Sequence, residues 1–97
     1  MSAATISGET KFEKAAHVVV RAQRDEFLFY NSRTDELHLI PPTGEFVYGL
    51  CDGVKTAAEI IRALAASVNA EELRVTERVT GFLQALENRG LVERVDG

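Results

Sequence analysis

The stretch from Phe46 to Leu64, FVYGLCDGVKTAAEIIRAL, constrains the fold of this sequence more than any other part of it. Asp52-Gly53 is a strong turn pair, and glycine tolerates the left-handed conformation in which many helices end. Thr56 is followed three residues later by Glu59 and then by two isoleucines, which is the capping-box signature of a helix N-terminus. The stretch therefore predicts two short helices joined by a tight turn, and both need apolar partners to be stable.

The segments before this stretch are typical of β-strands. His17–Ala22 is rich in β-branched residues, Phe27–Tyr30 is aromatic, and Glu36–Ile40 alternates in polarity. Short polar segments that favour turns separate them. Their spacing predicts two hairpins and hence a three-stranded antiparallel sheet. Within the last strand, Leu37 and Leu39 are expected to form the dry face.

The sequence after the two central helices predicts one more helix, from about Ala70 to Arg89. Asn69 is its expected N-cap, Gly90 its expected end, and Thr43 the expected cap of the first helix. Leu91-Val92 is expected either to pack back on the last helix or to add a short terminal strand. The expected apolar face of the last helix consists of Val75, Val79, Phe82, Leu83 and Leu86.

Three strands followed by three helices predict an α+β domain. The chain has 97 residues, of which 45% are hydrophobic, which is enough for one small domain whose core needs neither disulfides nor metal. We expect this domain to cover residues 15–95. Residues 1–14 are mostly small, polar or charged, and they predict a flexible N-terminal arm.

The composition argues against several classes of function. A formal net charge of −4 disfavours a domain whose main partner is a nucleic-acid backbone. No apolar run is long enough to span a bilayer and no secretion leader is recognisable, so we expect a cytoplasmic protein without membrane contact. His17, His38 and Cys51 lack metal-ligand spacing, and no nucleophile–base pair or phosphate-binding glycine loop is present. We therefore expect no metal, no cofactor and no catalysis, and we interpret Cys51 as a buried small hydrophobe, with a reactive thiol as the alternative.

The run from Ile40 to Val92 resembles the PqqD-like family, the peptide-binding domains called RiPP recognition elements. The likeness lies in a short helix that ends in Asp-Gly, a Thr-capped helix with Glu-Ile, and a long helix that closes in Gly-Leu-Val. One position departs from the family pattern, because Pro41 stands where the family usually has Asn. The matching residues are Thr43-Gly44, Phe46-Val47, Leu50-Cys51-Asp52-Gly53, Thr56, Glu59-Ile60, Leu64, Phe82-Leu83, Leu86 and Gly90-Leu91-Val92.

The resemblance implies a winged helix-turn-helix-like domain that is not an enzyme. Such a domain binds the leader segment of a ribosomally made precursor peptide and, as a peptide chaperone, presents it to a modifying enzyme, often a radical SAM protein. The leader adds as a strand to the exposed edge of the third strand, here Glu36–Ile40, and lies against the third helix, here roughly Arg74–Ala85. The implied peptide-binding residues are Glu36, Leu37, His38, Leu39, Ile40, Arg74, Val75, Arg78, Gly81, Phe82 and Ala85.

The residues themselves are compatible with this role. Edge strands are often guarded by Lys or Pro, and Glu36–Ile40 contains neither. One face of the third helix carries Arg74, Arg78, Gly81 and Ala85 at helical spacing. Gly81 costs a helix about 1 kcal/mol relative to alanine, and a closely passing peptide backbone would explain it. The two arginines can pair with acidic side chains of a leader.

Each of these features also has an alternative explanation. The N-terminal arm can cover the strand edge, and Gly81 can relieve packing against the sheet. The arginines can be solvated or can pair with Glu71 and Glu77, and His38 is expected to be a surface residue. A helix-turn-helix fold is also typical of DNA-binding winged-helix proteins, although this third helix mixes arginines with glutamates. An exposed edge strand can further pair with its own copy, which would give a homodimer.

Overall fold

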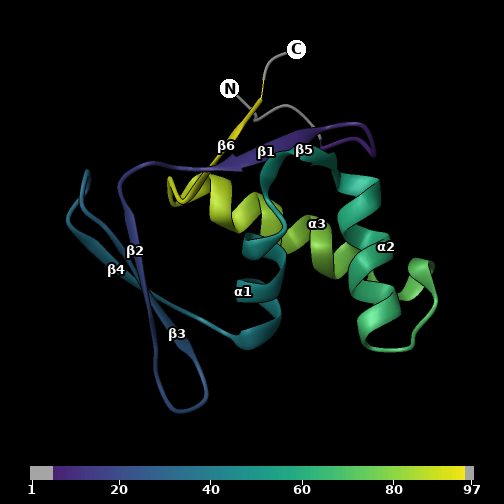
Figure 1. The fold of residues 1–97 in the computed structure, drawn as a ribbon, viewed down its shortest axis with the longest axis horizontal. Helices are drawn as coiled ribbons and strands as arrows, with labels where there is room; N and C mark the ends of the chain where they lie inside the picture. Colours follow the sequence, from purple (N-terminus) through teal and green to yellow (C-terminus); the bar gives the residue numbers. More distant parts are fainter. Residues whose placement is uncertain (1–5, 96–97) are drawn as a thin grey trace.

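The structure is a computed structural model that describes residues 6–95 (Figure 1). These residues form two three-stranded sheets and three helices. The strands are β1 (Lys11–Lys14), β2 (Val18–Ala22), β3 (Phe27–Asn31), β4 (Glu36–Ile40), β5 (Asp52–Thr56) and β6 (Val92–Arg94), and the helices are α1 (Pro42–Gly49), α2 (Ala57–Ser67) and α3 (Glu72–Asn88). The fold is therefore mixed α and β, as predicted, but it has two sheets in place of the expected one.

The sheet β2-β3-β4 is the predicted antiparallel meander. Each strand pairs with the next one along the chain, in a register that places Val20 beside Phe29 and Phe29 beside His38. Because β3 is the central strand, β2 and β4 are the edges of this sheet. Figure 1 shows the sheet projecting from one side of the molecule, with β4 leading directly into α1.

The dry face of β4 is the opposite of the expected one. Leu37 and Leu39 are 63% and 57% exposed, whereas Ile40 is 3% exposed. His38 lies beside the fully buried Phe29 and shares its inner face, so the expected surface position of His38 is also wrong. The register decides this outcome, because residues paired across strands share a face and Phe29 anchors that face in the core.

A second sheet, β5-β1-β6, replaces the turn expected at Asp52-Gly53. Gly53 does have the expected left-handed backbone, with a φ of +82°, but both residues begin β5, which pairs with β1. β6 pairs with the other side of β1, which confirms the short terminal strand that was one of the two expectations for Leu91-Val92. Three distant parts of the chain meet in this sheet, and local sequence patterns do not reveal such long-range pairing.

The expected N-terminal arm overlaps the second sheet. Lys11–Lys14 is β1, and Phe12 within it is fully buried. The guanidinium carbon of Arg94 lies 5.7 Å from the centroid of the Phe12 ring. Full burial of one such ring stabilises a fold by about 1.5–3 kcal/mol, so the folded part of the chain starts before residue 15. Residues 1–5 of the expected arm lie outside the described residues.

The predicted capping box of α2 is confirmed. The Thr56 hydroxyl accepts a hydrogen bond from the Glu59 amide at 3.2 Å, and the Thr56 amide donates to the Glu59 carboxylate at 2.8 Å. The bond from the Thr56 amide is the main reason why the pKa of Glu59 is lowered. The reciprocal pair satisfies two amides that the first turn of a helix leaves without partners.

The caps expected for the other two helices are wrong. α1 begins at Pro42 with no side-chain cap, because proline fits the first turn of a helix, and Thr43 lies inside that turn. Asn69 has a left-handed φ of 55° and follows the end of α2, while α3 begins at Glu72. Gly90 closes α3 with a φ of +72°, as predicted.

One hydrophobic cluster joins the two sheets and the three helices. Among residues 6–95, no helix combines the length and the apolar character that crossing a membrane requires. The largest fully buried side chains are Phe12, Phe29, Ile60, Leu83, Leu86, Leu91, Val47, Val79, Val92 and Cys51.

Candidate functional site

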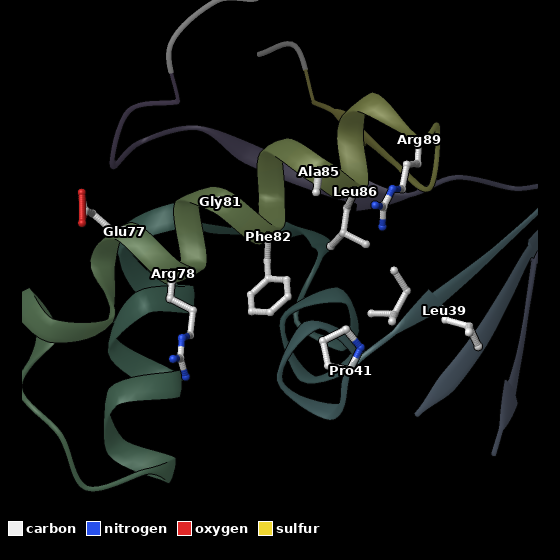
Figure 2. A pocket seen from close by; sticks show the side chains of 10 residues that line it. Leu39, Pro41, Glu77, Arg78, Gly81, Phe82, Ala85, Leu86 and Arg89 are labelled. Carbon is white, nitrogen blue, oxygen red and sulfur yellow. The ribbon is translucent and has the colours of Figure 1, made fainter. Parts of the chain in front are cut away.

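A groove with a volume of about 430 Å³ lies between the end of β4 and helix α3 (Figure 2). Leu39, Ile40 and Pro41 form one wall, at the point where β4 leads into α1. Helix α3 and the residue that follows it form the other wall with Glu77, Arg78, Gly81, Phe82, Ala85, Leu86 and Arg89.

The base of the groove is closely packed. A Cβ atom on Gly44 of α1 would lie 2.7 Å from Cγ2 of Ile40 and 3.0 Å from the Phe82 ring, so only glycine fits there. Ile40 and Leu86 are 3% and 1% exposed, so each presents only an edge to the groove. Ile40 of one wall and Phe82 of the other are therefore closely packed around Gly44.

A buried asparagine connects the sheet to the C-terminal end of α3. Asn31, which is 3% exposed, donates from Nδ2 to the Arg89 carbonyl at 3.0 Å and accepts at Oδ1 from the Arg33 amide at 3.0 Å. A Cβ atom on Gly90 would lie 2.9 Å from Nδ2 of Asn31, and the left-handed backbone at Gly90 also favours glycine. Asn31 thus ties the β3–β4 hairpin to α3 and fixes the separation of the groove walls.

Strand β4 also offers an unpaired edge. It pairs with β3, and no strand within residues 6–95 pairs with its other side. Residues 6–14 do not cover this edge, because β1 pairs with β5 and β6 in the other sheet. A free strand edge presents backbone amides and carbonyls that an extended peptide can satisfy.

Arg78 of α3 and Arg89, which caps the C-terminal end of that helix, line the groove. Within residues 6–95, neither Arg78 nor Arg89 has an ion-pair partner, whereas Arg74 lies outside the groove, 3.9 Å from Glu71. The ion pair that sequence reasoning left as an alternative is therefore present for Arg74. Glu77 also lines the groove, but Figure 2 shows its carboxylate pointing away from the other lining side chains. The facing charges are consequently positive.

Gly81 faces open space at the middle of the groove wall. A Cβ atom there would find no described atom within 4 Å, apart from the neighbouring residues and backbone of its own helix. The alternative that Gly81 relieves packing against the sheet is therefore wrong. Ala85, one turn later, adds only a methyl group to the same wall. Between the two arginines the helix surface thus leaves room for another chain to approach its backbone.

The structure brings together only part of the predicted site. Val75 is 7% exposed and belongs to the core, while the outward-facing Leu37 contributes to a separate pocket on the outer face of the sheet. The Nε2 atom of His38 is buried without a hydrogen bond among the described residues, 3.6 Å from the Glu36 carboxylate. The predicted residues that line the groove are Leu39, Ile40, Arg78, Gly81, Phe82 and Ala85. Those outside it are Glu36, Leu37, His38, Arg74 and Val75.

Four lining residues are absent from the predicted set, namely Pro41, Glu77, Leu86 and Arg89. One signal was available for Arg89, because the spacing from Arg78 through Gly81 and Ala85 continues to it after one more helical turn. The sequence interpretation placed Arg89 at the end of the helix and did not include it in the peptide-binding set. No comparable signal marks Pro41, because its position depends on how β4 meets α3.

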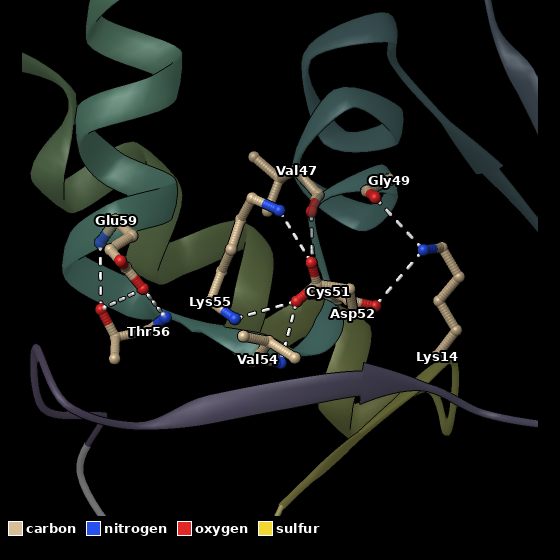
Figure 3. Close-up of polar contacts among 9 residues, drawn as sticks. All are labelled: Lys14, Val47, Gly49, Cys51, Asp52, Val54, Lys55, Thr56 and Glu59. Atoms are coloured by element: carbon tan, nitrogen blue, oxygen red, sulfur yellow. Dashed lines mark hydrogen bonds and ion pairs between the residues drawn. The ribbon is translucent and has the colours of Figure 1, made fainter.

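The polar contacts around β5 are structural (Figure 3). The Cys51 thiol donates to the Val47 carbonyl at 3.4 Å, and burial raises the pKa of Cys51 to about 12. It is therefore protonated at neutral pH and is a poor nucleophile. The Lys14 ammonium donates to the carbonyls of Gly49 and Cys51 at 3.2 and 3.3 Å, which joins β1 to the end of α1.

Asp52 organises the start of β5. Its carboxylate accepts from the Lys55 ammonium at 2.7 Å and from the amides of Lys55 and Val54 at 2.9 Å each. These hydrogen bonds hold the pKa of Asp52 well below its usual range. Among residues 6–95, no three His, Cys, Asp or Glu side chains are grouped closely enough to hold a metal ion.

Comparisons with known proteins connect this geometry to a family and to one complex. The family profile described as Coenzyme PQQ synthesis protein D (PqqD) matches residues 26–92. No curated protein matches the chain. A solved structure described as TbiB1 in complex with the TbiA(beta) leader peptide is similar, with a TM-score of 0.71 and 25% sequence identity over 84% of this chain and 94% of that chain.

Proposed function

This chain belongs to the PqqD family, and we propose that it is a RiPP recognition element, which binds the leader segment of a ribosomally made precursor peptide. One observation carries the proposal. A fold that resembles a solved leader-peptide complex presents a groove between the unpaired edge of β4 and helix α3.

The groove supports binding of a peptide as an added strand. Backbone groups on the open side of β4 can pair with the peptide backbone, which gives affinity with little dependence on sequence. The residues of α3 then select side chains, because those of an added strand point alternately toward the helix and away from it. Phe82 offers an apolar ring in the middle of the groove, and the two arginines offer charge at its sides.

We further propose that the protein acts as a peptide chaperone and not as a catalyst. The groove is lined by apolar, small and cationic side chains and by Glu77, whose carboxylate points away from the others in Figure 2, so it offers no pair of groups suited to acid–base or nucleophilic chemistry. Its role is then to hold a leader while a separate modifying enzyme, for which a radical SAM protein is our first candidate, acts on the rest of the precursor. The α2–α3 pair corresponds in this proposal to the helix-turn-helix of a winged-helix fold.

An NMR titration tests the proposal. The isotopically labelled protein is titrated with leader peptides of precursors encoded beside its gene, and amide shifts are mapped on the structure. We expect shifts at β4 and at Arg78, Gly81 and Ala85, with no change in the sheet β5-β1-β6. Duplex DNA is the control ligand, since a net charge of −4 predicts weak and strongly salt-dependent binding.

Proline substitutions separate edge binding from loss of folding. Leu39→Pro changes the open edge beside the groove, and Val19→Pro is the matched control on β2, the other edge of the same sheet. If both variants keep the native spectrum, only Leu39→Pro should weaken leader binding. Equal affinity of the two variants, or shifts confined to other parts of the protein, would contradict strand addition at β4.

A further inference from the structure

The separation of the two groove arginines determines which ligand side chains can reach both of them. Arg78 of α3 and Arg89, the residue that caps the end of α3, both line the groove. Eleven helical residues correspond to a rise of about 16–17 Å. An extended strand covers that distance with about five residues. Because alternate residues of a strand share a face, two ligand side chains that reach both arginines are about four or six residues apart.

The wall between the arginines is shaped for a closely passing backbone. Gly81 faces open space, with no described atom near the position of a Cβ, and Ala85 adds only a methyl group. A large side chain on the peptide at this level would push the strand away from the helix. A small residue there would let the peptide backbone lie against Gly81 while both guanidiniums remain within reach.

The outer face of β4 favours apolar side chains on the peptide that binds beside it. Leu37 and Leu39 are 63% and 57% exposed on the side of the sheet that faces away from the core. A strand added to β4 places every second side chain beside these two leucines. Apolar residues at those positions would remove the leucines from water, whereas charged residues would leave them uncovered.

We infer that the peptide taken by this groove carries two carboxylates about four or six residues apart on its helix-facing side, a small residue between them, and apolar residues at the alternate positions. The inference rests on the proposed function and deepens it by naming the chemistry of the leader. The charged side chains that line the groove are Arg78, Arg89 and Glu77. Among residues 6–95, the two arginines have no ion-pair partner, and the Glu77 carboxylate points away from the other lining side chains in Figure 2.

Selection from a random peptide library displayed on phage tests the inference, because it lets the groove choose among peptides of every sequence. The immobilised bait is the full chain, either unchanged or with both Arg78→Glu and Arg89→Glu. Arg74→Glu is the matched control, because it reverses a charge on the same helix outside the groove. We expect the unchanged protein and the control to enrich peptides with two acidic residues at the inferred spacing, and the double variant to lose that enrichment.

The outcomes distinguish the inference from the proposed function. Enriched peptides without paired acidic residues, or the same enrichment with the double variant, would overturn the inference while leaving peptide binding intact. Failure of the unchanged protein to enrich any peptide would instead count against the proposed function. Selection of peptides that match Glu36–Ile40 of this chain would indicate that the edge pairs with a second copy, and it would also overturn the inference.

Binding measurements on one enriched peptide complete the test. Arg78→Gln and Arg89→Gln should each weaken binding about two- to fivefold, as is usual for exposed charge pairs. Replacing the matching peptide Glu by Gln should have the same effect on the unchanged protein and little further effect on the variant. Additive losses from the two replacements would show that the arginine and the peptide carboxylate do not interact.

Discussion

Replacing Gly81 by alanine is expected to stabilise the free protein and to weaken its binding of peptide. Glycine inside a helix costs about 1 kcal/mol relative to alanine. The new Cβ would meet no described atom within 4 Å outside the neighbouring residues and backbone of its own helix, so no clash offsets that gain. In a domain of this size a gain of about 1 kcal/mol raises Tm by about 4–8 °C.

The effect of Gly81→Ala on peptide affinity has the opposite sign to its effect on stability. The added methyl group would occupy the wall against which the peptide backbone is proposed to lie. Forcing one methyl group into a packed contact costs about 1–3 kcal/mol, which corresponds to a loss of affinity of about 5-fold to 150-fold. A glycine that improves binding at the expense of stability is a pattern expected at functional sites.

Thermal melts followed by circular dichroism measure the first effect, and fluorescence anisotropy with a labelled leader or library-selected peptide measures the second. Gly49→Ala is the matched control, because Gly49 is also helical with no described atom near the position of a Cβ, but it lies outside the groove. This control should not change affinity. The reasoning is refuted if Gly81→Ala binds peptide as tightly as the unchanged protein or is less stable.

Four further predictions concern the packing around the groove and β5. Gly44→Ala should lower stability to urea by about 1–3 kcal/mol, because its Cβ would lie 2.7 Å from a buried isoleucine atom; an unchanged urea midpoint would contradict this. Asn31→Ala should lower the free energy of unfolding by about 1–3 kcal/mol and reduce peptide affinity, since it removes the hydrogen bond at 3.0 Å that joins the sheet to the end of α3. Normal affinity of this variant would show that the groove does not depend on this link. Burial raises the pKa of Cys51 to about 12, so its thiol should react with Ellman's reagent only as fast as the protein opens, and prompt reaction of the native protein would be the contrary result. Unfolding returns this thiol to its ordinary pKa, so above about pH 8.5 the unfolded chain binds fewer protons than the folded protein. The free energy of unfolding should therefore fall as the pH rises above about 8.5, and urea titrations across that range measure this effect.

The parts of the fold that the sequence predicted are those set by neighbouring residues. The capping box at Thr56, the hairpins of the meander and the glycine that ends α3 all depend on contacts within a few residues. The second sheet was missed because β1 pairs with strands far away along the chain. The inner face of β4 was assigned to the wrong residues because its direction is set by Phe29 on the neighbouring strand.

In the candidate site, too, features set by neighbouring residues were predicted and features set by distant parts of the chain were missed. The family resemblance implied Arg78, Gly81 and Ala85 as peptide-binding residues, and helical spacing places them on one face. Arg74 satisfied the same spacing but lies beyond the end of the groove, since the extent of the groove depends on where β4 meets α3. The role of Asn31 was not predictable, because its partner at Arg89 comes from the other end of the chain.

The position of β1 between β5 and β6 has a consequence for the order of folding during synthesis. β1 has its partners in the middle of the chain and at residues 92–94, so Phe12 cannot reach its fully buried position until residue 94 has been made. The meander β2-β3-β4 contains only local pairings and can form much earlier. We therefore expect pulse-labelled hydrogen exchange to protect the meander first and β1 last, so that β1, which precedes the meander along the chain, completes the fold.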